Sequence, residues 1–286
     1  MNIAFVTYAK SPRFTPSDKL LVKPLESFGH KLFPAPWDNP EIDWQKFDVL
    51  ILRSCWNYHL HIDGFLSWLK KIKKLGIRLW NPYQIVLWNI DKRYLFDLEK
   101  KGIGIIPTKL IKKNAVSTLK KYFSDFNCQE LIVKPTIGAS AYKINRFLVS
   151  EAEIRLKDFQ QMLTQTDCLI QPLMKEIFEG EISMIFLGKK FSHAILKQPR
   201  QDEFRVQIEL GGTEELTNLS PELIKQGQKI IDSIKGNLLY ARVDGIIHDG
   251  KFMLMELELV EPHLFLDLYP PSTLQFAQAF QKLSES

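Results

Sequence analysis

The sequence predicts a protein of mixed α/β and α+β class that is built from three units. Short apolar strands alternate with helical spacings over residues 1–85, which is typical of a small layer with a parallel sheet. Beyond residue 171 the apolar runs are longer and follow one another as antiparallel strands do, and two of them flank an Asp249-Gly250 turn. These changes of pattern predict units at 1–85, 86–170 and 171–286.

The first unit is expected to contain four strands and two helices. One helix, Leu20–Phe28, ends at Gly29. A second, at about Asp63–Leu75, has an apolar stripe on one face and lysine pairs on the other, which we interpret as a solvated face. Asn81-Pro82 closes the unit. The predicted strands are Ile3–Thr7, Lys31–Ala35, Val49–Arg53 and Ile77–Trp80.

The second and third units follow from further apolar runs. A helical spacing over Ile85–Lys101 stops at Gly102 and Gly104, and Ile105 starts the next run. The second unit is then expected to contain the strands Leu131–Lys134 and Cys168–Gln171, each ended by proline, with another strand and the helix Glu151–Leu163 between them. The third unit is expected to contain the strands Glu181–Leu187, Phe191–Lys197, Arg205–Leu210, Tyr240–His248 and Lys251–Val260, and the helices Pro221–Ile234 and Ser272–Leu283.

Composition restricts the class of protein. Hydrophobic residues make up 45% and charged residues 25% of the 286, which is ordinary for a globular chain. No apolar run reaches the length of a membrane span, and the N-terminus lacks the features of a signal peptide. Three scattered cysteines fit a reducing compartment, so we expect a cytoplasmic protein without a membrane partner. The lysine pairs are too sparse for nucleic-acid binding, whereas the net charge of +5 suits a site for anionic phosphates.

Two carboxylates lie within the second arm of the predicted hairpin. Glu256 and Glu258 are two residues apart, so they project from one face of the strand and repel each other unless a cation lies between them. Asp244 joins that face if the hairpin loop has three residues, with Gly250 in the left-handed region, whereas a two-residue loop would turn it away. Three such carboxylates would suit Mg²⁺, which prefers oxygen ligands. An exposed acidic face on an edge hairpin is the alternative.

Lys134 ends a predicted strand and is followed by a loop of small residues that contains Gly138 and Ser140. Backbone N–H groups of such a loop can approach a phosphate closely, and a lysine beside it adds a positive charge. The P-loop pattern GxxxxGK[ST] is absent. Lys92 is a candidate for a second phosphate lysine. A plain strand and turn, with Lys92 on a helix surface, is the alternative reading.

Two further segments are candidates for ligand contacts. The extended link Gln171–Met174 offers backbone groups to the edge of an adenine ring, and Glu179 or Glu181 just beyond it could hold ribose hydroxyls. A connector between subdomains is the alternative. Lys197 and Arg205 flank a polar loop, and fixed cations stabilise the charge that develops on a transferring phosphoryl group. Structural ion pairs with Asp202, Glu203 or Glu209 would also explain these two cations.

The order of these pieces is more specific than any one of them. It runs from Lys92 through Lys134 and its loop, the glutamate-bearing hinge and the Lys197–Arg205 loop to Arg242-x-Asp244 and Glu256-x-Glu258. In this order the chain resembles the ATP-grasp superfamily of carboxylate–amine ligases over essentially its whole length. The Lys197–Gly212 stretch is similar to the matching loop of glutathione synthetases and RimK-type glutamate ligases. A closer likeness, to the ATP-grasp ligases of D-cycloserine biosynthesis, lies in the blocks Arg53–Tyr58, Trp80–Pro82, Trp88–Leu95 and Arg242–Pro262.

This resemblance implies an ATP-grasp fold, in which a Rossmann-like N-terminal domain precedes two lobes that sandwich ATP. It also implies a role for each candidate residue. For the nucleotide, Lys92 and Lys134, with the loop of Gly138 and Ser140, would contact the ATP phosphates, Gln171, Leu173 and Met174 would frame adenine, and Glu181 or the nearby Glu179 would bind ribose. Asp244, Glu256 and Glu258 would hold Mg²⁺. For catalysis, Lys197 and Arg205 would face the γ-phosphate and the acyl phosphate, and Arg242 would stabilise the tetrahedral intermediate or the carboxylate.

The implied activity is that of an ATP-dependent carboxylate–amine ligase, which acts through an acyl phosphate on an amino acid or peptide-like substrate and releases ADP and phosphate. A peptide or protein terminus is an alternative acceptor, and a homodimer is compatible with the resemblance. An ATP-binding module or sensor without ligase chemistry is the alternative function. Candidate substrate contacts are Arg53, Ser54, Asn57 and Tyr58, whereas Trp56 is assigned to packing.

The chain departs from the superfamily pattern at three of these positions. Glu258 stands where many members have Asn, which adds a negative charge to the predicted metal site. Cys55 and Asn57 stand where we expect Thr and Asp in the cycloserine group. Because such positions help to form the acceptor site, these two departures leave the substrate open and the nucleotide unaffected.

Overall fold

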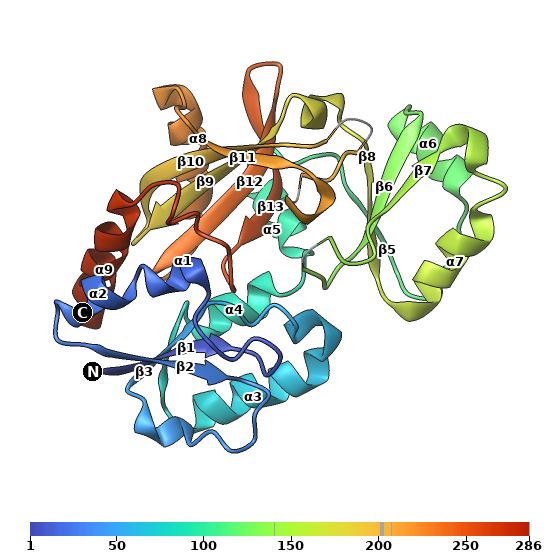
Figure 1. Cartoon of the computed structure of the whole chain (residues 1–286). Helices are drawn as coiled ribbons and strands as arrows, with labels where there is room; N and C mark the ends of the chain where they lie inside the picture. The colour runs from blue at the N-terminus through green and yellow to red at the C-terminus, as the bar shows by residue number, and fades with distance from the viewer. Residues whose placement is uncertain (140, 201–202, 207, 286) are drawn as a thin grey trace.

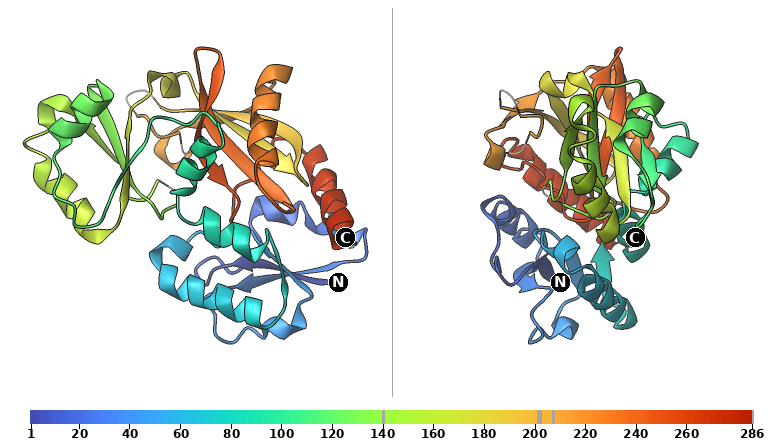
Figure 2. Two further views of the ribbon diagram at one scale, coloured as in Figure 1. Left: turned by 180° about the vertical axis from the view of Figure 1, so that it is seen from behind. Right: turned by 90° about the vertical axis from the view of Figure 1, so that its right-hand side faces the viewer.

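The computed structural model describes residues 1–139, 141–200, 203–206 and 208–285. It contains three sheets, and the unit with the second sheet along the chain stands to one side of the other two units (Figure 1, Figure 2). In the described part, no helix combines the length and the apolar character needed to cross a lipid bilayer. The cysteines Cys55, Cys128 and Cys168 are free, as their scattered spacing predicts.

The first unit is a parallel sheet, as predicted, and its strand order is β2-β1-β3-β4. Side chains alternate between its faces: Ala4 and Val6 pack against helix α3, whereas Ile3 and Phe5 pack against the third unit. The predicted helix Leu20–Phe28 corresponds to a shorter helix, Val22–Glu26, and a further short helix, Pro16–Lys19, precedes it. The elements are β1 Asn2–Thr7, α1 Pro16–Lys19, α2 Val22–Glu26, β2 Lys31–Pro36, β3 Val49–Leu52, α3 Ile62–Lys74 and β4 Arg78–Trp80.

The second unit is an antiparallel sheet of order β5-β8-β6-β7 with a hydrophobic core of its own. Its helix α6 has no counterpart among the predicted elements. Leu119, Tyr122 and Phe123 do have helical spacing, but they span only two turns around a lysine pair. The elements are β5 Lys109–Ile111, α6 Leu119–Phe126, β6 Glu130–Pro135, β7 Asn145–Leu148, α7 Leu156–Gln165 and β8 Cys168–Pro172.

The third unit is a sheet of order β11-β10-β9-β12-β13 in which every neighbouring pair is antiparallel. Helix α8 packs on one face, and helix α9 on the face toward the first unit. The elements are β9 Glu181–Leu187, β10 Lys190–Gln198, β11 Thr213–Thr217, α8 Pro221–Asp232, β12 Tyr240–His248, β13 Lys251–Glu258 and α9 Pro271–Ser284. Short 3-10 helices lie at Trp44–Lys46, Tyr58–Leu60, Val149–Glu151, Lys175–Phe178 and Ile208–Leu210.

The predicted strand Arg205–Leu210 is wrong. Of its described residues, Ile208–Leu210 form a 3-10 helix, and the edge strand β11 begins only at Thr213. The backbone N–H groups of Phe204 and Arg205 donate to the Glu203 carboxylate at 2.9 and 3.0 Å. Because these donors are used locally, they are not available to a neighbouring strand.

The predicted helix Ile85–Lys101 is broken into α4 (Tyr83–Asn89) and α5 (Tyr94–Lys100). The break lies at Asp91, whose carboxylate accepts from the Arg93 N–H at 3.0 Å. Leu95 and Leu98 of α5 are buried in the core of the third unit rather than that of the second, although the boundaries expected from the sequence group them with the second. Helix α5 therefore belongs structurally to the sheet that carries the predicted carboxylates, whereas Val86 of α4 is buried in the core of the first unit.

Helices α4 and α5 also cover the free edge of strand β13. The Asn89 amide donates to Leu257 O and accepts from Leu259 N, both at 2.7 Å, and the Tyr94 hydroxyl accepts from Leu257 N at 2.8 Å. The Asn81 amide donates to Leu259 O at 2.7 Å. Side chains thus satisfy the buried backbone groups that an additional strand would otherwise pair.

The hairpin of β12 and β13 reaches the predicted arrangement by another route. Its loop has two residues, because His248 pairs with Lys251, and Asp249 and Gly250 both have positive φ values of 48° and 71°. A bulge between the Gly245–Leu254 and Asp244–Glu256 pairs adds one residue, Met255, to β13. Asp244 therefore faces Glu256 after all, although the expected three-residue loop is wrong.

Gly245 makes this bulge possible, since a Cβ atom there would lie 2.3 Å from the Met253 carbonyl oxygen. We expect Gly245→Ala to lower the free energy of unfolding by about 2–3 kcal/mol, because backbone must move to relieve the overlap. Gly64→Ala is the matched control: its Cβ would meet Trp37 at an ordinary 3.7 Å within helix α3, and it should gain about 0.5 kcal/mol. Urea unfolding measures both changes, and equal effects at the two sites would contradict this account of the bulge.

Candidate functional site

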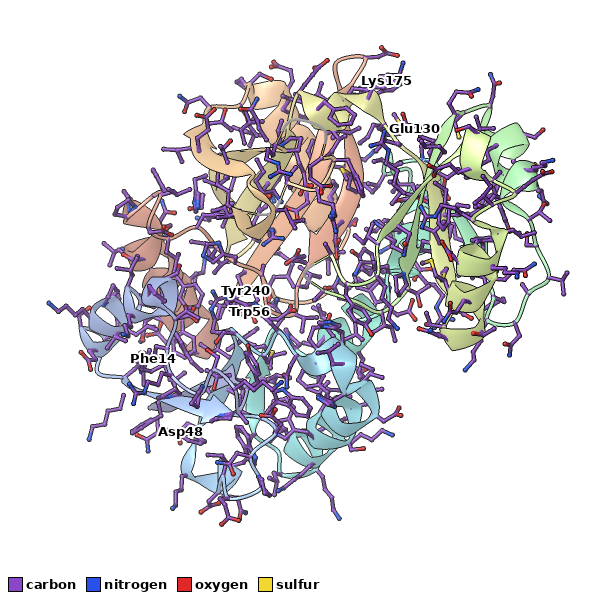
Figure 3. The ribbon with its side chains drawn as sticks, turned by 45° about the vertical axis from the view of Figure 1, so that its right-hand side comes forward. Phe14, Asp48, Trp56, Glu130, Lys175 and Tyr240 are labelled. Atoms are coloured by element: carbon purple, nitrogen blue, oxygen red, sulfur yellow. The ribbon has the colours of Figure 1, made fainter. Side chains whose placement is uncertain are left out.

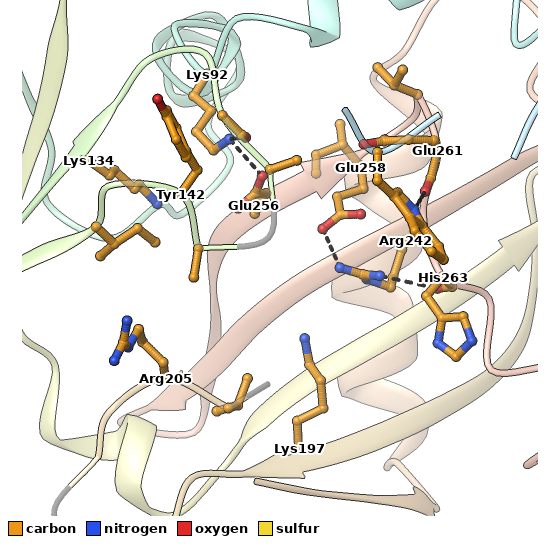
Figure 4. Close-up of a pocket in the computed structure, with 18 of the residues that line it drawn as sticks. Lys92, Lys134, Tyr142, Lys197, Arg205, Arg242, Glu256, Glu258, Glu261 and His263 are labelled. Atoms are coloured by element: carbon orange, nitrogen blue, oxygen red, sulfur yellow. Dashed lines mark hydrogen bonds and ion pairs between the residues drawn. The ribbon is translucent and has the colours of Figure 1, made fainter. Parts of the chain in front are cut away.

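Two adjoining cavities lie where the three units meet. The larger has a volume of about 690 Å³ and draws lining residues from the first unit (Trp56, Tyr58), the loop after β6 and the end of β13. The smaller, of about 120 Å³, lies between the second and third sheets. Charged side chains line both cavities and form the wall between them, which we call the shared wall: Lys134, Lys197, Arg205, Arg242, Glu256 and Glu258 (Figure 4).

Apart from this wall, the smaller cavity is lined mainly by apolar side chains, with Gln171, Glu181 and Asp244 as its further polar residues. Gln171, Leu173 and Met174 line it, as predicted for an adenine pocket, together with Ile106, Ile132 and Ile177, which sequence reasoning missed. The Gln171 amide donates to the Thr108 hydroxyl at 2.8 Å, which fixes the end of β8. Glu181 lines this cavity, whereas Glu179 is exposed and absent from its lining. A flat heterocycle fits such a slot, with backbone groups of the link at its edge.

Lys92 and Lys134 both line the larger cavity, and both are buried. The Lys92 ammonium contacts the Gly138 carbonyl and lies 3.1 Å from the Glu256 carboxylate. Burial lowers the pKa of Lys134, and the proximity of Lys92 lowers it further. Two buried ammonium groups so close together favour an anionic ligand such as a phosphate. The predicted contact of Ser140 lies outside the described residues.

Lys197 forms a buried group with two carboxylates. It pairs with Glu181 across strands β10 and β9, and its ammonium lies 3.9 Å from Asp244. Burial alone would lower the pKa of Lys197, but Asp244 and Glu181 outweigh it, so the pKa is raised and the side chain stays charged. Arg205 also lines both cavities and is held by two hydrogen bonds, of 2.8 and 3.0 Å, to Glu203. Of the ion pairs weighed from the sequence, the one between Arg205 and Glu203 is present, whereas Lys197 pairs with Glu181 instead; Asp202 lies outside the described residues.

Arg242 contacts carboxylates on both strands of the hairpin, Asp244 on β12 and Glu258 on β13. Its guanidinium donates to both Asp244 oxygens at 2.9–3.0 Å and also contacts Glu258. Burial raises the pKa of Asp244, but Arg242 and Lys197 outweigh it and the net pKa is lowered; the Ser183 hydroxyl also donates to it at 2.5 Å. Burial raises the pKa of Glu258 to about 8. The positive charge of Arg242 lowers this pKa, but the negative charges of Asp244, Glu256 and Glu261 raise it. The negative charge on this face of β12 and β13 is therefore not fully neutralised by the neighbouring cations.

The predicted metal ligands are on one face but are not gathered around a common point. Among the described residues, no group of three or more His, Cys, Asp or Glu side chains is placed to hold a metal ion. Asp244 and Glu258 are bound to Arg242, and Glu256 to Lys92. Their oxygen chemistry fits Mg²⁺, and Glu256 and Glu258 keep 30% and 25% of their side chains exposed toward the cavity. The metal role of the three residues stays a prediction.

Only one of the four predicted substrate contacts lines either cavity in the described part, and it is Tyr58. Arg53 is buried, donates to Asp18 at 2.8 Å and to Pro262 O at 3.2 Å, and so holds the units together. A guanidinium cannot be buried without such partners. Ser54 is fully buried, and the Asn57 amide bonds to Trp37 and Asp38. The geometry does not support substrate contact by Arg53, Ser54 or Asn57.

Sequence reasoning also missed residues at the far end of the larger cavity. Trp56, which was assigned to packing, lines it, and its indole donates to the Glu261 carbonyl at 3.3 Å. Figure 3 labels Trp56 and Tyr240 close together at the junction of the first and third units. Other lining residues that were not predicted include Tyr142, Glu261, His263 and Phe265. A third glutamate shortly after Glu256 and Glu258 was the available signal for Glu261.

Comparison with protein-family models assigns both parts of the chain. Residues 3–81 match the N-terminal domain of the D-cycloserine synthetase DcsG, and residues 100–265 match the prokaryotic glutathione synthetase ATP-grasp domain. The chain belongs to this ATP-grasp family. It is therefore an ATP-grasp ligase, of the class that forms C–N bonds, with the fold that the sequence resemblance implied.

Individual ATP-grasp proteins show the same likeness. The cycloserine biosynthesis protein DcsG of Streptomyces lavendulae is 27% identical over 263 residues, which cover 85% of each chain. A crystal structure of D-cycloserine synthetase DcsG has a TM-score of 0.87 at 24% identity, over 99% of each chain. D-alanine–D-alanine ligase of Bacillus anthracis complexed with ATP gives 0.72 at 16% identity over 100% of this chain and 96% of that one. The macrocyclase MdnC of Microcystis aeruginosa, bound with precursor peptide MdnA, gives 0.68 at 16% identity over 100% of both.

The Glu261 carboxyl makes a testable contribution to the pH dependence of stability. Burial raises its pKa from 4.5 to about 7, against the opposing effect of its own backbone N–H, Lys92 and Arg242. Between these values the folded state binds a proton that the unfolded state has lost, so stability falls as pH rises through this window. In metal-free buffer, Glu261→Gln should therefore gain about 1–3 kcal/mol over the wild type between pH 5 and pH 8 in urea unfolding.

Glu222→Gln, at an exposed position of helix α8, is the control for this measurement. It removes the same charge far from the cavity and should show no such change with pH. If the difference between Glu261→Gln and the wild type is the same at pH 5 and pH 8, the carboxyl is not perturbed as described.

Proposed function

We propose that this ATP-grasp ligase activates a substrate carboxylate with ATP as an acyl phosphate and joins it to an amine of an amino acid or peptide-like substrate. The observation that carries the proposal is the shared wall: cations that belong to both the apolar slot and the polar cavity. A nucleotide in the slot would direct its terminal phosphate at this wall, and a carboxylate substrate in the larger cavity would meet it from the other side. The wall is thus suited to neutralise charge in transfer between them.

Each part of the wall has its own task in this proposal. Lys92 and Lys134 bind the phosphates of ATP, and Gln171, Leu173 and Met174 hold adenine, with Glu181 toward the ribose. Lys197 and Arg205 stabilise the transferring phosphoryl group. Arg242 stabilises the acyl carbon–oxygen group when the amine attacks and phosphate leaves. The chemistry needs no nucleophilic side chain, because ATP supplies the activation and the wall supplies position and charge.

Asp244, Glu256 and Glu258 are the residues that would hold Mg²⁺. The ion would supply positive charge that offsets the charge of the ATP phosphates. Binding would require Glu256 to exchange its contact with Lys92 for the ion, which frees that ammonium for phosphate. Burial raises the pKa of Glu258 to about 8, and a bound divalent cation would favour the ionised form of this carboxyl.

An ATP-binding module without ligase chemistry is the second candidate. The observation in its favour is that Lys197, Arg205 and Arg242 of the wall each already have a carboxylate partner, as in a purely structural network. Against it, the network faces two cavities instead of being enclosed in a core. An ATP-binding module would bind ATP without releasing ADP on any acceptor.

ADP release from Mg-ATP by the purified protein tests the proposal. We expect release with one pool from a panel of amino acids, dipeptides and O-ureido-serine, and none when Mg²⁺ is omitted. Mass spectrometry of the products separates ligation from simple phosphorylation, because a ligase leaves no stable phosphorylated substrate. Nucleotide binding without ADP release in any pool, including peptides, would favour the binding module.

Variants of the shared wall and of Asp244, which pairs with Arg242 of the wall, provide a sharper prediction. Asp244→Ala and Glu256→Ala should abolish Mg²⁺-dependent ADP release, and Lys197→Met should lower kcat by about 100-fold or more, because each removes charge stabilisation at the reacting groups. Lys71→Met, on the exposed face of helix α3, should keep the wild-type rate. Circular dichroism would check that each variant is folded. Wild-type turnover in both carboxylate variants would sink the assignment of the wall.

A further inference from the structure

The larger cavity ends in a group of side chains that has no task in the proposed phosphoryl transfer. Trp56 and Tyr58 reach it from the first unit, and Glu261, His263 and Phe265 reach it from the segment that follows β13. We call these five residues the Glu261 subsite. Figure 4 shows Glu261 and His263 on the same side of the cavity as Arg242, away from Lys134 and Arg205.

Glu261 differs from the carboxylates of the shared wall. It is only 7% exposed, yet none of the described Lys, Arg or His side chains forms an ion pair with it, whereas Glu256 and Glu258 each have one. Its carboxylate receives its own backbone N–H, and the charges of Lys92 and Arg242 act only from a distance. A buried, ionised carboxylate without an ion-pair partner destabilises the fold, and a bound cation would remove this cost.

The backbone around Glu261 is fixed, so the carboxylate cannot turn toward the cations of the wall by a shift of the chain. The Trp56 indole donates to Glu261 O at 3.3 Å, Arg53 donates to Pro262 O at 3.2 Å, and Arg242 donates to His263 O at 3.2 Å. The Tyr240 hydroxyl lies 2.9 Å from Val260 O. Donors from two units therefore hold the segment on either side of Glu261, which preorganises it for a ligand.

The surroundings select a compact organic cation. Trp56, Tyr58 and Phe265 supply aromatic surface, which attracts an ammonium group. Burial, with Arg242 close by, lowers the pKa of His263 to about 4, so this imidazole is neutral and does not repel a cation. A metal ion is a poorer candidate, because among the described residues no group of three or more His, Cys, Asp or Glu side chains is placed to hold one.

We propose that the Glu261 subsite binds the ammonium group of an amino-acid-like substrate, with Glu261 as the counter-ion and Trp56 and Tyr58 as aromatic walls. The inference rests on the proposed function, since it places the carboxyl end of the same substrate at the shared wall. It narrows the substrate class to molecules that carry both a carboxylate and a charged amino group. Substrates that replace the amino group by hydroxyl or hydrogen are excluded.

Saturation-transfer NMR on the full chain, with Mg²⁺ and a non-hydrolysable ATP analogue, tests this without any need for turnover. The probes are a pool of free amino acids and the dipeptide Ala-Ala, with a second pool of the matching 2-hydroxy acids. We expect signals from the amino pool only. Glu261→Gln should weaken the binding of the responding amino acid or dipeptide by about 10- to 100-fold, the usual loss for a hydrogen bond to a charged group. Glu261→Asp, which keeps the charge, should retain part of it.

Glu222→Gln is the matched control, since it removes a carboxylate from exposed surface and should bind like the wild type. Calorimetry of the ATP analogue shows separately whether each variant is folded and whether the nucleotide slot functions. Signals of equal strength from Glu261→Gln, equal binding of the hydroxy acids, or no amino-acid signal at all would each overturn the subsite. Loss of nucleotide binding in the wild type would instead overturn the proposed function, and the two failures are thereby distinguished.

Discussion

Mutual neutralisation of buried charges is the constraint on which this site depends. Lys197, Arg242 and Asp244 have almost no access to solvent, and each would be strongly destabilising alone. Together they compensate one another, because Arg242 spans both oxygens of Asp244 and Lys197 approaches from the neighbouring strand. The same balance holds the side chains in one geometry, so the charges that meet a ligand are already oriented when it arrives.

Two devices of the third sheet produce this geometry. The bulge at Met255 reverses the alternation of strand β13, so that Phe252 and Leu254 are buried before it and Leu257 after it. The glutamates beyond the bulge then share a face with Asp244 and Arg242. Asn81, Asn89 and Tyr94 hold the free edge of the same strand in place of a further strand. An edge strand can in this way carry a functional face without exposing its backbone to another chain.

Much of this arrangement could be predicted from the sequence, because local signals carried it. The Asp-Gly turn, the Glu-x-Glu spacing and the lysine at the end of a strand each depend on a few neighbouring residues. The bulge was not predicted, although the shift of apolar residues from Phe252 and Leu254 to Leu257 and Leu259 records it. The methionines at 253 and 255 are compatible with either face, and they concealed the shift.

The predictions that failed concern partners far away in the sequence. Arg53 was a candidate substrate contact, but its partner Asp18 is 35 residues away and Pro262 is 209 away. Likewise, nothing near Trp56 indicates that its indole meets Glu261 across 205 residues. Pattern and propensity describe a segment and its immediate surroundings, whereas the acceptor end of the cavity is assembled from two units. For this reason the nucleotide side was more accessible to sequence reasoning than the substrate side.

The hydrogen bonds that Arg53 and Trp56 make to the segment after β13 have a consequence for recombination. Two separate family models describe the chain, with a break between residues 81 and 100, which suggests modules that could be exchanged between relatives. The contacts cross that break and reach residues 261 and 262. In a chimera that replaced only the N-terminal module, the residues in place of Arg53 and Trp56 would come from the relative, whereas the backbone carbonyls of Glu261 and Pro262 that they contact would be unchanged. A functional exchange would therefore require that the segment with Arg53 and Trp56 and the segment after β13 come from the same relative, although they are far apart in the gene.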